Sequence, residues 1–95
     1  MSKKIKVLVV DDSVFMRKAI TKIITTDEIE VVGSAINGKE AIKKNELLKP
    51  DLITMDVEMP VMNGLDAVKI IMDQLPCPIL MLSTLTTDGS THFSF

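Results

Sequence analysis

Four short apolar runs alternate with three stretches whose apolar residues recur every three or four positions. The runs are residues 5–10, 29–35, 52–55 and 79–82. They are nearly continuous and rich in Val, Ile and Leu, which is typical of strands covered on both faces of a parallel sheet. Gly33 weakens the second run. The pattern therefore predicts four buried strands.

The three intervening stretches predict amphipathic helices. Asp12 or Ser13 can cap the first helix, the second spans residues 39–48 before Pro50, and Pro76 stops the third. We expect the inward positions to be Phe15, Met16, Ala19, Ile20, Ile23 and Ile24 in the first helix, Ala41, Ile42, Leu47 and Leu48 in the second, and Leu65, Val68, Met72 and Leu75 in the third.

The order β-α-β-α-β-α-β predicts a single α/β domain with a parallel sheet and helices on both faces. Residues 85–95 are polar and show no clear periodicity. The carboxyl ends of parallel strands lie along one edge, where open α/β sheets bind their ligands. Functional side chains are therefore expected at that edge.

Polar side chains follow three of the predicted strands. Asp11 and Asp12 end the first strand, Asp56 ends the third, and Ser83 and Thr84 end the fourth. Three carboxylates brought together would repel one another and raise one another's pKa unless a cation balanced them. Mg²⁺ prefers carboxylate oxygens, so the pattern predicts a magnesium site.

Such a site has a defined chemistry. With the charge balanced, one oxygen of Asp56 can act as a nucleophile on phosphorus. Magnesium would neutralise charge on the transferred phosphoryl group. A hydroxyl at Ser83 could then donate a hydrogen bond to a phosphoryl oxygen. The residues thus favour phosphoryl transfer to Asp56.

Helix capping is the competing interpretation, because Asp and Ser commonly follow strands for that reason alone. Taken singly, Asp11, Asp12 and Ser83 are better explained as caps, and Asp56 is balanced between the two interpretations. A capping box needs Glu or Gln three residues after the cap, and Phe15 and Met16 stand there instead. The three carboxylates together indicate a functional site.

The amino-acid composition favours a packed globular domain over a disordered or nucleic-acid-binding chain. Hydrophobic residues make up 46% of the chain, which favours a packed domain, and a net charge of −2 argues against a nucleic-acid surface. The single cysteine cannot form an internal disulfide, which suggests a reducing compartment. With no long apolar run and no apolar N-terminal block, we expect a cytoplasmic protein.

Other chemically interesting residues favour structural interpretations. His92 has no partner at a metal-ligand spacing, and Cys77 lies between two prolines with nothing that would lower its pKa. Met16, Met72 and Met81 fall at positions expected to face inward, where they would fill the core.

The motifs together resemble the receiver domain of two-component response regulators. They are Val-Leu-Val-Val-Asp-Asp-Ser at residues 7–13, Met-Pro-Val-Met-Asn-Gly-Leu-Asp-Ala at residues 59–67, and Leu-Ser-Thr-Leu-Thr at residues 82–86. The resemblance is closer to the receiver of the chemotaxis protein-glutamate methylesterase than to receivers in general. The resemblance implies a flavodoxin-like three-layer sandwich with strand order 2-1-3-4 and the fifth strand missing.

The resemblance also implies a role for each site residue. Asp56 is the phosphoacceptor, which takes a phosphoryl group from a histidine kinase. Asp11, Asp12, Asp56 and the backbone carbonyl of Glu58 bind Mg²⁺. Ser83 is the switch hydroxyl, with Thr84 as the second choice. The output passes to an effector domain or a downstream protein.

The chain departs from the family pattern after its fourth strand. Family receivers continue through a fourth helix, a fifth strand that begins with a lysine, and a fifth helix, and none of these has a match here. We therefore expect residues 1–95 to be one receiver truncated at its C-terminus, and we assign it no esterase activity. The fourth strand should be an exposed edge through which copies associate, unless residues 91–95 fold back over it.

Two other functions remain open. A Mg²⁺-dependent aspartyl phosphatase of another α/β class would resemble Asp-x-Asp after the first strand, whereas Asp11 and Asp12 are adjacent. A receiver-like binding module that is not phosphorylated is the other alternative, and the short C-terminus makes it credible.

Overall fold

Strands and helices alternate along the chain in the predicted order. The computed structural model describes residues 3–83 and 92–93. Its elements are β1 (Ile5–Val10), α1 (Val14–Ile24), β2 (Ile29–Ala35), α2 (Gly38–Leu48), β3 (Leu52–Asp56), α3 (Gly64–Gln74), β4 (Ile79–Ser83) and β5 (His92–Phe93). In the part of the chain that the structure describes, no helix is long and apolar enough to cross a membrane.

The sheet has the strand order β2-β1-β3-β4-β5. The first four strands in this order are parallel, which confirms the predicted order 2-1-3-4. The two-residue strand β5 pairs antiparallel with the carboxyl end of β4, opposite Leu82 and Ser83. The chain thus folds back over the β4 edge at His92 and Phe93, as the alternative to an exposed edge anticipates. Residues 91, 94 and 95 lie outside the described part.

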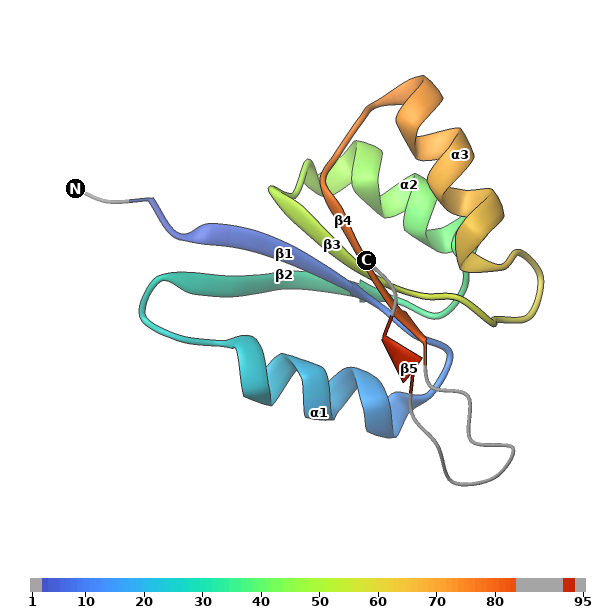
Figure 1. Cartoon of the computed structure of the whole chain (residues 1–95). Helices are drawn as coiled ribbons and strands as arrows, with labels where there is room; N and C mark the ends of the chain where they lie inside the picture. Colours follow the sequence, from blue (N-terminus) through green and yellow to red (C-terminus); the bar gives the residue numbers. More distant parts are fainter. Residues whose placement is uncertain (1–2, 84–91, 94–95) are drawn as a thin grey trace.

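The sheet is covered on both faces, as predicted (Figure 1). Helix α1 lies on one face against β1 and β2, and α2 and α3 lie side by side on the other. The larger part of the core lies beneath α2 and α3. Its buried members are Leu8, Val10, Ala35, Ala41, Ile53, Met55, Ala67, Ile71 and Cys77.

The predicted inner face of α1 is partly wrong. Phe15 is 75% exposed and Ile23 is 78% exposed, whereas Met16, Ile20 and Ile24 are half-buried. The six residues expected to face inward span about half the circumference of this helix, which is wider than the stripe that one sheet contact covers. Spacing alone could not decide which part of that arc faces the sheet.

The inner faces of the other two helices also need correction. Leu47 in α2 is exposed, and so are three of the four residues expected inside α3, namely Leu65, Met72 and Leu75. The buried residues of α3 are Gly64, Ala67 and Ile71. At the start of the helix Gly64 lies directly against Asp56 and Met55, so α3 closely approaches the end of β3 there.

Gly64 makes that approach possible. A Cβ atom at this position would lie 2.1 Å from the backbone oxygen of Asp56. The backbone N–H of Gly64 donates to the carbonyl of Val57 over 2.8 Å, which joins the start of α3 to the end of β3. The glycine therefore controls where the strand end and its side chain lie.

We predict that Gly64→Ala lowers the free energy of unfolding by about 2 kcal/mol or more, because the methyl group meets backbone that cannot move aside. Urea unfolding followed by circular dichroism at 222 nm measures the change. Gly33→Ala is the matched control, because its Cβ would meet the flexible end of the Leu48 side chain. An equal loss in both variants would contradict the prediction.

Candidate metal and phosphoacceptor site

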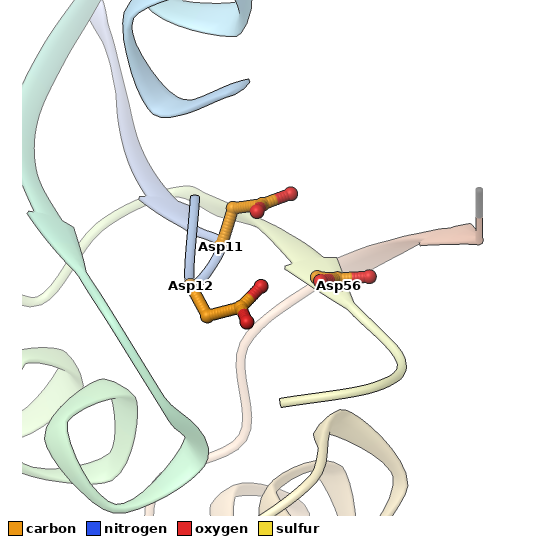
Figure 2. Close-up of side chains that lie close together, drawn as sticks. All are labelled: Asp11, Asp12 and Asp56. Carbon is orange, nitrogen blue, oxygen red and sulfur yellow. The ribbon is translucent and has the colours of Figure 1, made fainter. Parts of the chain in front are cut away.

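Three carboxylates converge at the carboxyl edge of the sheet. Asp11 and Asp12 follow β1, and Asp56 ends the neighbouring strand β3. One oxygen from each side chain lies within 4.8 Å of the others. Figure 2 shows the three side chains directed into the same space. The structure thus brings together the three carboxylates that the sequence singled out.

Asp11 is fixed in the turn between β1 and α1. Its backbone N–H donates to the carbonyl of Ala35 over 3.0 Å, which continues the pairing of β1 with β2. One of its carboxylate oxygens accepts from the N–H of Ser13 over 2.9 Å. Ser13 in turn caps α1, because its Oγ accepts from the N–H of Met16. The cap interpretation therefore holds for Ser13.

Asp56 is positioned by the loop that follows it, residues 57–63. Besides the contact of Gly64 with Val57, the N–H of Gly38 at the start of α2 donates to the carbonyl of Met62 over 2.8 Å. The N–H of Met62 donates to the carbonyl of Pro60 over 2.7 Å, closing a γ-turn around Val61. Val61 has a φ of 68°, a strained value for a β-branched residue.

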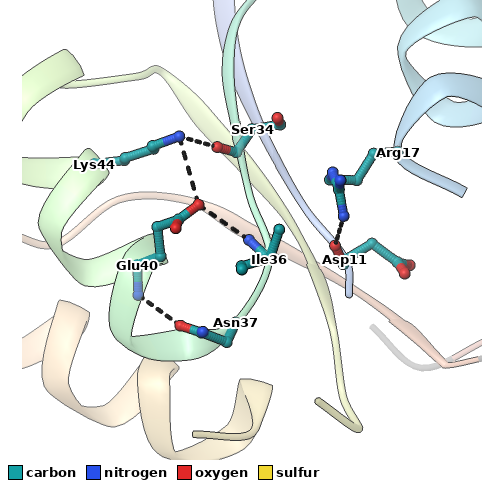
Figure 3. A network of polar contacts seen from close by, with 7 residues as sticks. All are labelled: Asp11, Arg17, Ser34, Ile36, Asn37, Glu40 and Lys44. Atoms are coloured by element: carbon teal, nitrogen blue, oxygen red, sulfur yellow. Dashed lines mark hydrogen bonds and ion pairs between the residues drawn. The ribbon is translucent and has the colours of Figure 1, made fainter. Parts of the chain in front are cut away.

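The start of α2, which holds this loop, is stabilised by a polar network (Figure 3). The Asn37 side chain accepts from the N–H of Glu40, and the Glu40 carboxylate accepts from the N–H of Ile36. Lys44 pairs with Glu40 over 3.5 Å and donates to the carbonyl of Ser34. These contacts satisfy backbone groups at the helix start and fix Gly38 against the loop.

The electrostatics of the cluster raise the pKa of two of its members. Burial raises the pKa of Asp56 to about 6, and the charges of Asp11 and Asp12 add to this effect. Burial also raises the pKa of Asp11. The hydrogen bond from the Ser13 N–H lowers it, but burial is the larger effect. Within the described part of the chain, the one salt bridge joins Lys44 to Glu40 and none reaches the cluster. The Arg17 guanidinium lowers the pKa of Asp11 but forms no salt bridge with it, so the three carboxylates leave the cluster with a net negative charge.

This donor set suits a hard divalent cation. Carboxylate oxygens at this spacing can share one octahedral ion that keeps several waters, as Mg²⁺ does. Positive charge would also remove the repulsion that raises the pKa of Asp56. The residues present therefore fit magnesium.

The remaining predicted site residues are less well defined. Glu58 is exposed in the loop after Asp56, and its role as a carbonyl ligand stays a prediction. Asp56 pairs with Leu82, so the backbone of Ser83 lies one residue beyond that pair on the neighbouring strand. Thr84 lies outside the described residues. Cys77 is buried, and burial raises the pKa of its thiol, which favours a structural role.

The positioning residues were missed by sequence reasoning. Asn37-Gly38 and Asn63-Gly64 have the composition of turns, yet each is an N-cap followed by the first residue of a helix. The signal was the repeated dipeptide after two different strands. In both copies the Gly packs against residues 56–63, so the dipeptides locate the loop as well as the helices.

Comparisons with known proteins agree with this geometry. The model of the response regulator receiver domain family matches residues 7–93. The chain is 60% identical over 88 residues to a protein-glutamate methylesterase/protein-glutamine glutaminase from Idiomarina loihiensis, covering 92% of this chain and 23% of that protein. The corresponding protein of Pyrococcus horikoshii is 55% identical over 91 residues, covering 95% and 25%. The chain thus spans about a quarter of the length of these relatives.

Solved structures show the same fold. The response regulator domain of Thermotoga maritima CheB is similar with a TM-score of 0.85 and 49% identity, over 93% of this chain and 66% of that one. A CheX-CheY-BeF3-Mg²⁺ complex from Borrelia burgdorferi is similar with a TM-score of 0.77 and 34% identity, over 87% and 64%.

We predict that Asp56→Asn stabilises the metal-free protein at pH 7, since the raised pKa of Asp56 is a penalty on the folded state. Because the carboxyl is only half-buried and solvent screens its charge, we expect a gain of about 1 kcal/mol. Below pH 3.8 the carboxyl is protonated in both states and no penalty exists. The penalty develops as the pH rises from 3.8 to about 6.

Urea unfolding in EDTA at pH 4 and pH 7 measures this difference. Asp27→Asn is the control, because it removes an equal charge from an exposed loop that precedes β2. A gain for Asp56→Asn that is the same at both pH values would show that its charge is not the cause.

Proposed function

The chain belongs to the response regulator receiver family, and from this premise we propose that it accepts a phosphoryl group on Asp56 from a histidine kinase in a Mg²⁺-dependent reaction. The convergence of Asp11, Asp12 and Asp56 within 4.8 Å carries the proposal. Asp56 ends the central strand β3 and is half-buried, so one carboxylate can reach a donor at the rim.

In the proposed transfer, Asp56 is the nucleophile and neighbouring site residues hold the metal. An oxygen of ionised Asp56 attacks the phosphorus of the phosphohistidine, a P–O bond forms and the P–N bond breaks. The electron pair stays on the imidazole nitrogen, which then takes a proton from water. Asp11 and Asp12, with the carbonyl of Glu58, would hold the metal. Bound Mg²⁺ supplies positive charge that the phosphoryl oxygens share.

Ser83 is our candidate for the switch hydroxyl. The pairing of Asp56 with Leu82 supports it, because Ser83 follows at the same edge of the sheet. Its hydroxyl would donate to a phosphoryl oxygen once that group is attached. Thr84 is the second choice.

The similarity to protein-glutamate methylesterases supports a place in chemotaxis signalling. We propose that residues 1–95 act as the regulatory receiver of such a protein in the cytoplasm, linked to an effector domain. The similarity of the Borrelia structure, whose title includes BeF3 and Mg²⁺, supports the metal-dependent phosphoryl site. No methylesterase activity is assigned to these residues.

Phosphoryl uptake is tested by incubating the chain with Mg²⁺ and a small acyl phosphate, then measuring intact mass. We expect one added phosphoryl group, which is lost in Asp56→Asn and in EDTA because both the acceptor and the metal are required. Asp27→Asn should be labelled like the parent chain. Mg²⁺ binding without labelling would reject the acceptor role and favour a binding module that is not phosphorylated.

We also propose that copies associate through β4. In the described residues, β5 pairs only with Leu82 and Ser83, which leaves residues 79–81 without a strand partner on that side. Such an edge is a template for another chain. Sedimentation should show a concentration-dependent dimer that Leu80→Lys weakens by roughly tenfold or more, since a charge on an edge strand opposes pairing. A monomer at high concentration would refute the proposal.

A further inference from the structure

Arg17 reaches from α1 to the backbone of the metal site. Its Nη1 donates to the carbonyl oxygen of Asp11 over 2.9 Å (Figure 3). Arg17 is half-buried and lies one turn into the helix that Ser13 caps. We propose that Arg17 is a positioning residue, which fixes the peptide between Asp11 and Asp12 so that both carboxylates face the metal.

The bond acts on the geometry of both carboxylates. The carbonyl of Asp11 belongs to the peptide unit that joins Asp11 to Asp12, and this unit is planar and rigid. Holding the carbonyl therefore fixes ψ of Asp11 and φ of Asp12 together. The direction in which the Asp12 side chain leaves the backbone depends on that plane.

Asp12 has little else to hold it. It is exposed, and within the described residues no backbone N–H and no cationic side chain donates to its carboxylate. Asp11, in contrast, is held by the carbonyl of Ala35 and the N–H of Ser13. Within residues 3–83, Arg17 is the one donor to the carbonyl of Asp11. Asp12, whose carboxylate has no backbone donor in the described residues, is thus the residue that Arg17 would position.

The side chain is suited to this task. The guanidinium is always charged and presents donors in a rigid plane. It donates to the backbone and not to the carboxylates, so the carboxylate oxygens remain available to a cation. Partners that orient metal ligands in this way change metal affinity by about 10- to 100-fold when removed.

The inference rests on the proposed magnesium site and is tested on the full chain with three variants. Arg17→Met keeps the aliphatic stem and removes the donors. Arg17→Lys keeps the charge but replaces the planar guanidinium with a single donor nitrogen. Lys18→Met is the matched control, because it removes an equal charge from an exposed neighbour that makes no hydrogen bond in the described residues. Titration calorimetry measures Mg²⁺ affinity, and NMR measures the ¹³C shift of the Asp11 carbonyl in metal-free protein.

We expect Arg17→Met to weaken Mg²⁺ binding by roughly tenfold or more and to move the Asp11 carbonyl shift. Lys18→Met should stay within about twofold of the parent chain, and Arg17→Lys should fall between the two. At saturating Mg²⁺ the final extent of phosphoryl uptake should recover in Arg17→Met, since the acceptor itself is intact.

Equal Mg²⁺ affinity in Arg17→Met and Lys18→Met would overturn the inference while leaving the magnesium site in place. An unmoved Asp11 carbonyl shift in Arg17→Met would also overturn it. If Arg17→Met does not fold, Arg17→Lys decides, and an affinity equal to that of Lys18→Met overturns the inference. Failure of the parent chain to bind Mg²⁺ would reject the proposed metal site and this inference together.

Discussion

Mutual repulsion among three carboxylates is the constraint on which this structure depends. One carboxylate oxygen from each of Asp11, Asp12 and Asp56 lies within 4.8 Å of the others. Burial is the largest cause of the raised pKa of Asp56, and the charges of the two neighbours add to it. A chain free to relax would separate them. That it holds them together means that the rest of the fold must supply enough stabilisation to offset the repulsion, and that the arrangement is most favourable with a cation present.

The central pair of strands supplies that rigidity. Val10 pairs with Met55, so the next residues along β1 and β3 are Asp11 and Asp56. The register is held by fully buried side chains on both strands, including Ile53. Slipping one strand by a residue would move its buried side chains to the opposite face, which close packing forbids. The proximity of the two carboxylates is therefore a consequence of core packing beneath α2 and α3.

The sequence predicts the strands and the cluster better than it predicts the helix faces. A parallel sheet aligns its strand ends along one edge, and the strand order implied by the resemblance makes β1 and β3 neighbours, which together predict that Asp11 and Asp56 meet. Helix rotation depends instead on the space available: α3 turns Gly64 to the sheet and leaves Leu65 in solvent. A side chain that reaches a backbone carbonyl, as Arg17 does, carries no periodic signal and needs coordinates to be found.

The loop after Asp56 is clamped from both sides by glycines that lie far apart in the sequence. Gly38 leaves no room for a side chain against Met62 of this loop, and Gly64 leaves none against the backbone of Asp56 itself. Val61 lies within the same loop in a strained turn. A substitution at the start of α2 would therefore disturb the acceptor as directly as one beside it. The residues whose substitution affects Asp56 are those that contact it or its loop in space, and some of them lie far from it in the sequence. Sequence variation tolerated at α2 and α3 should consequently be correlated.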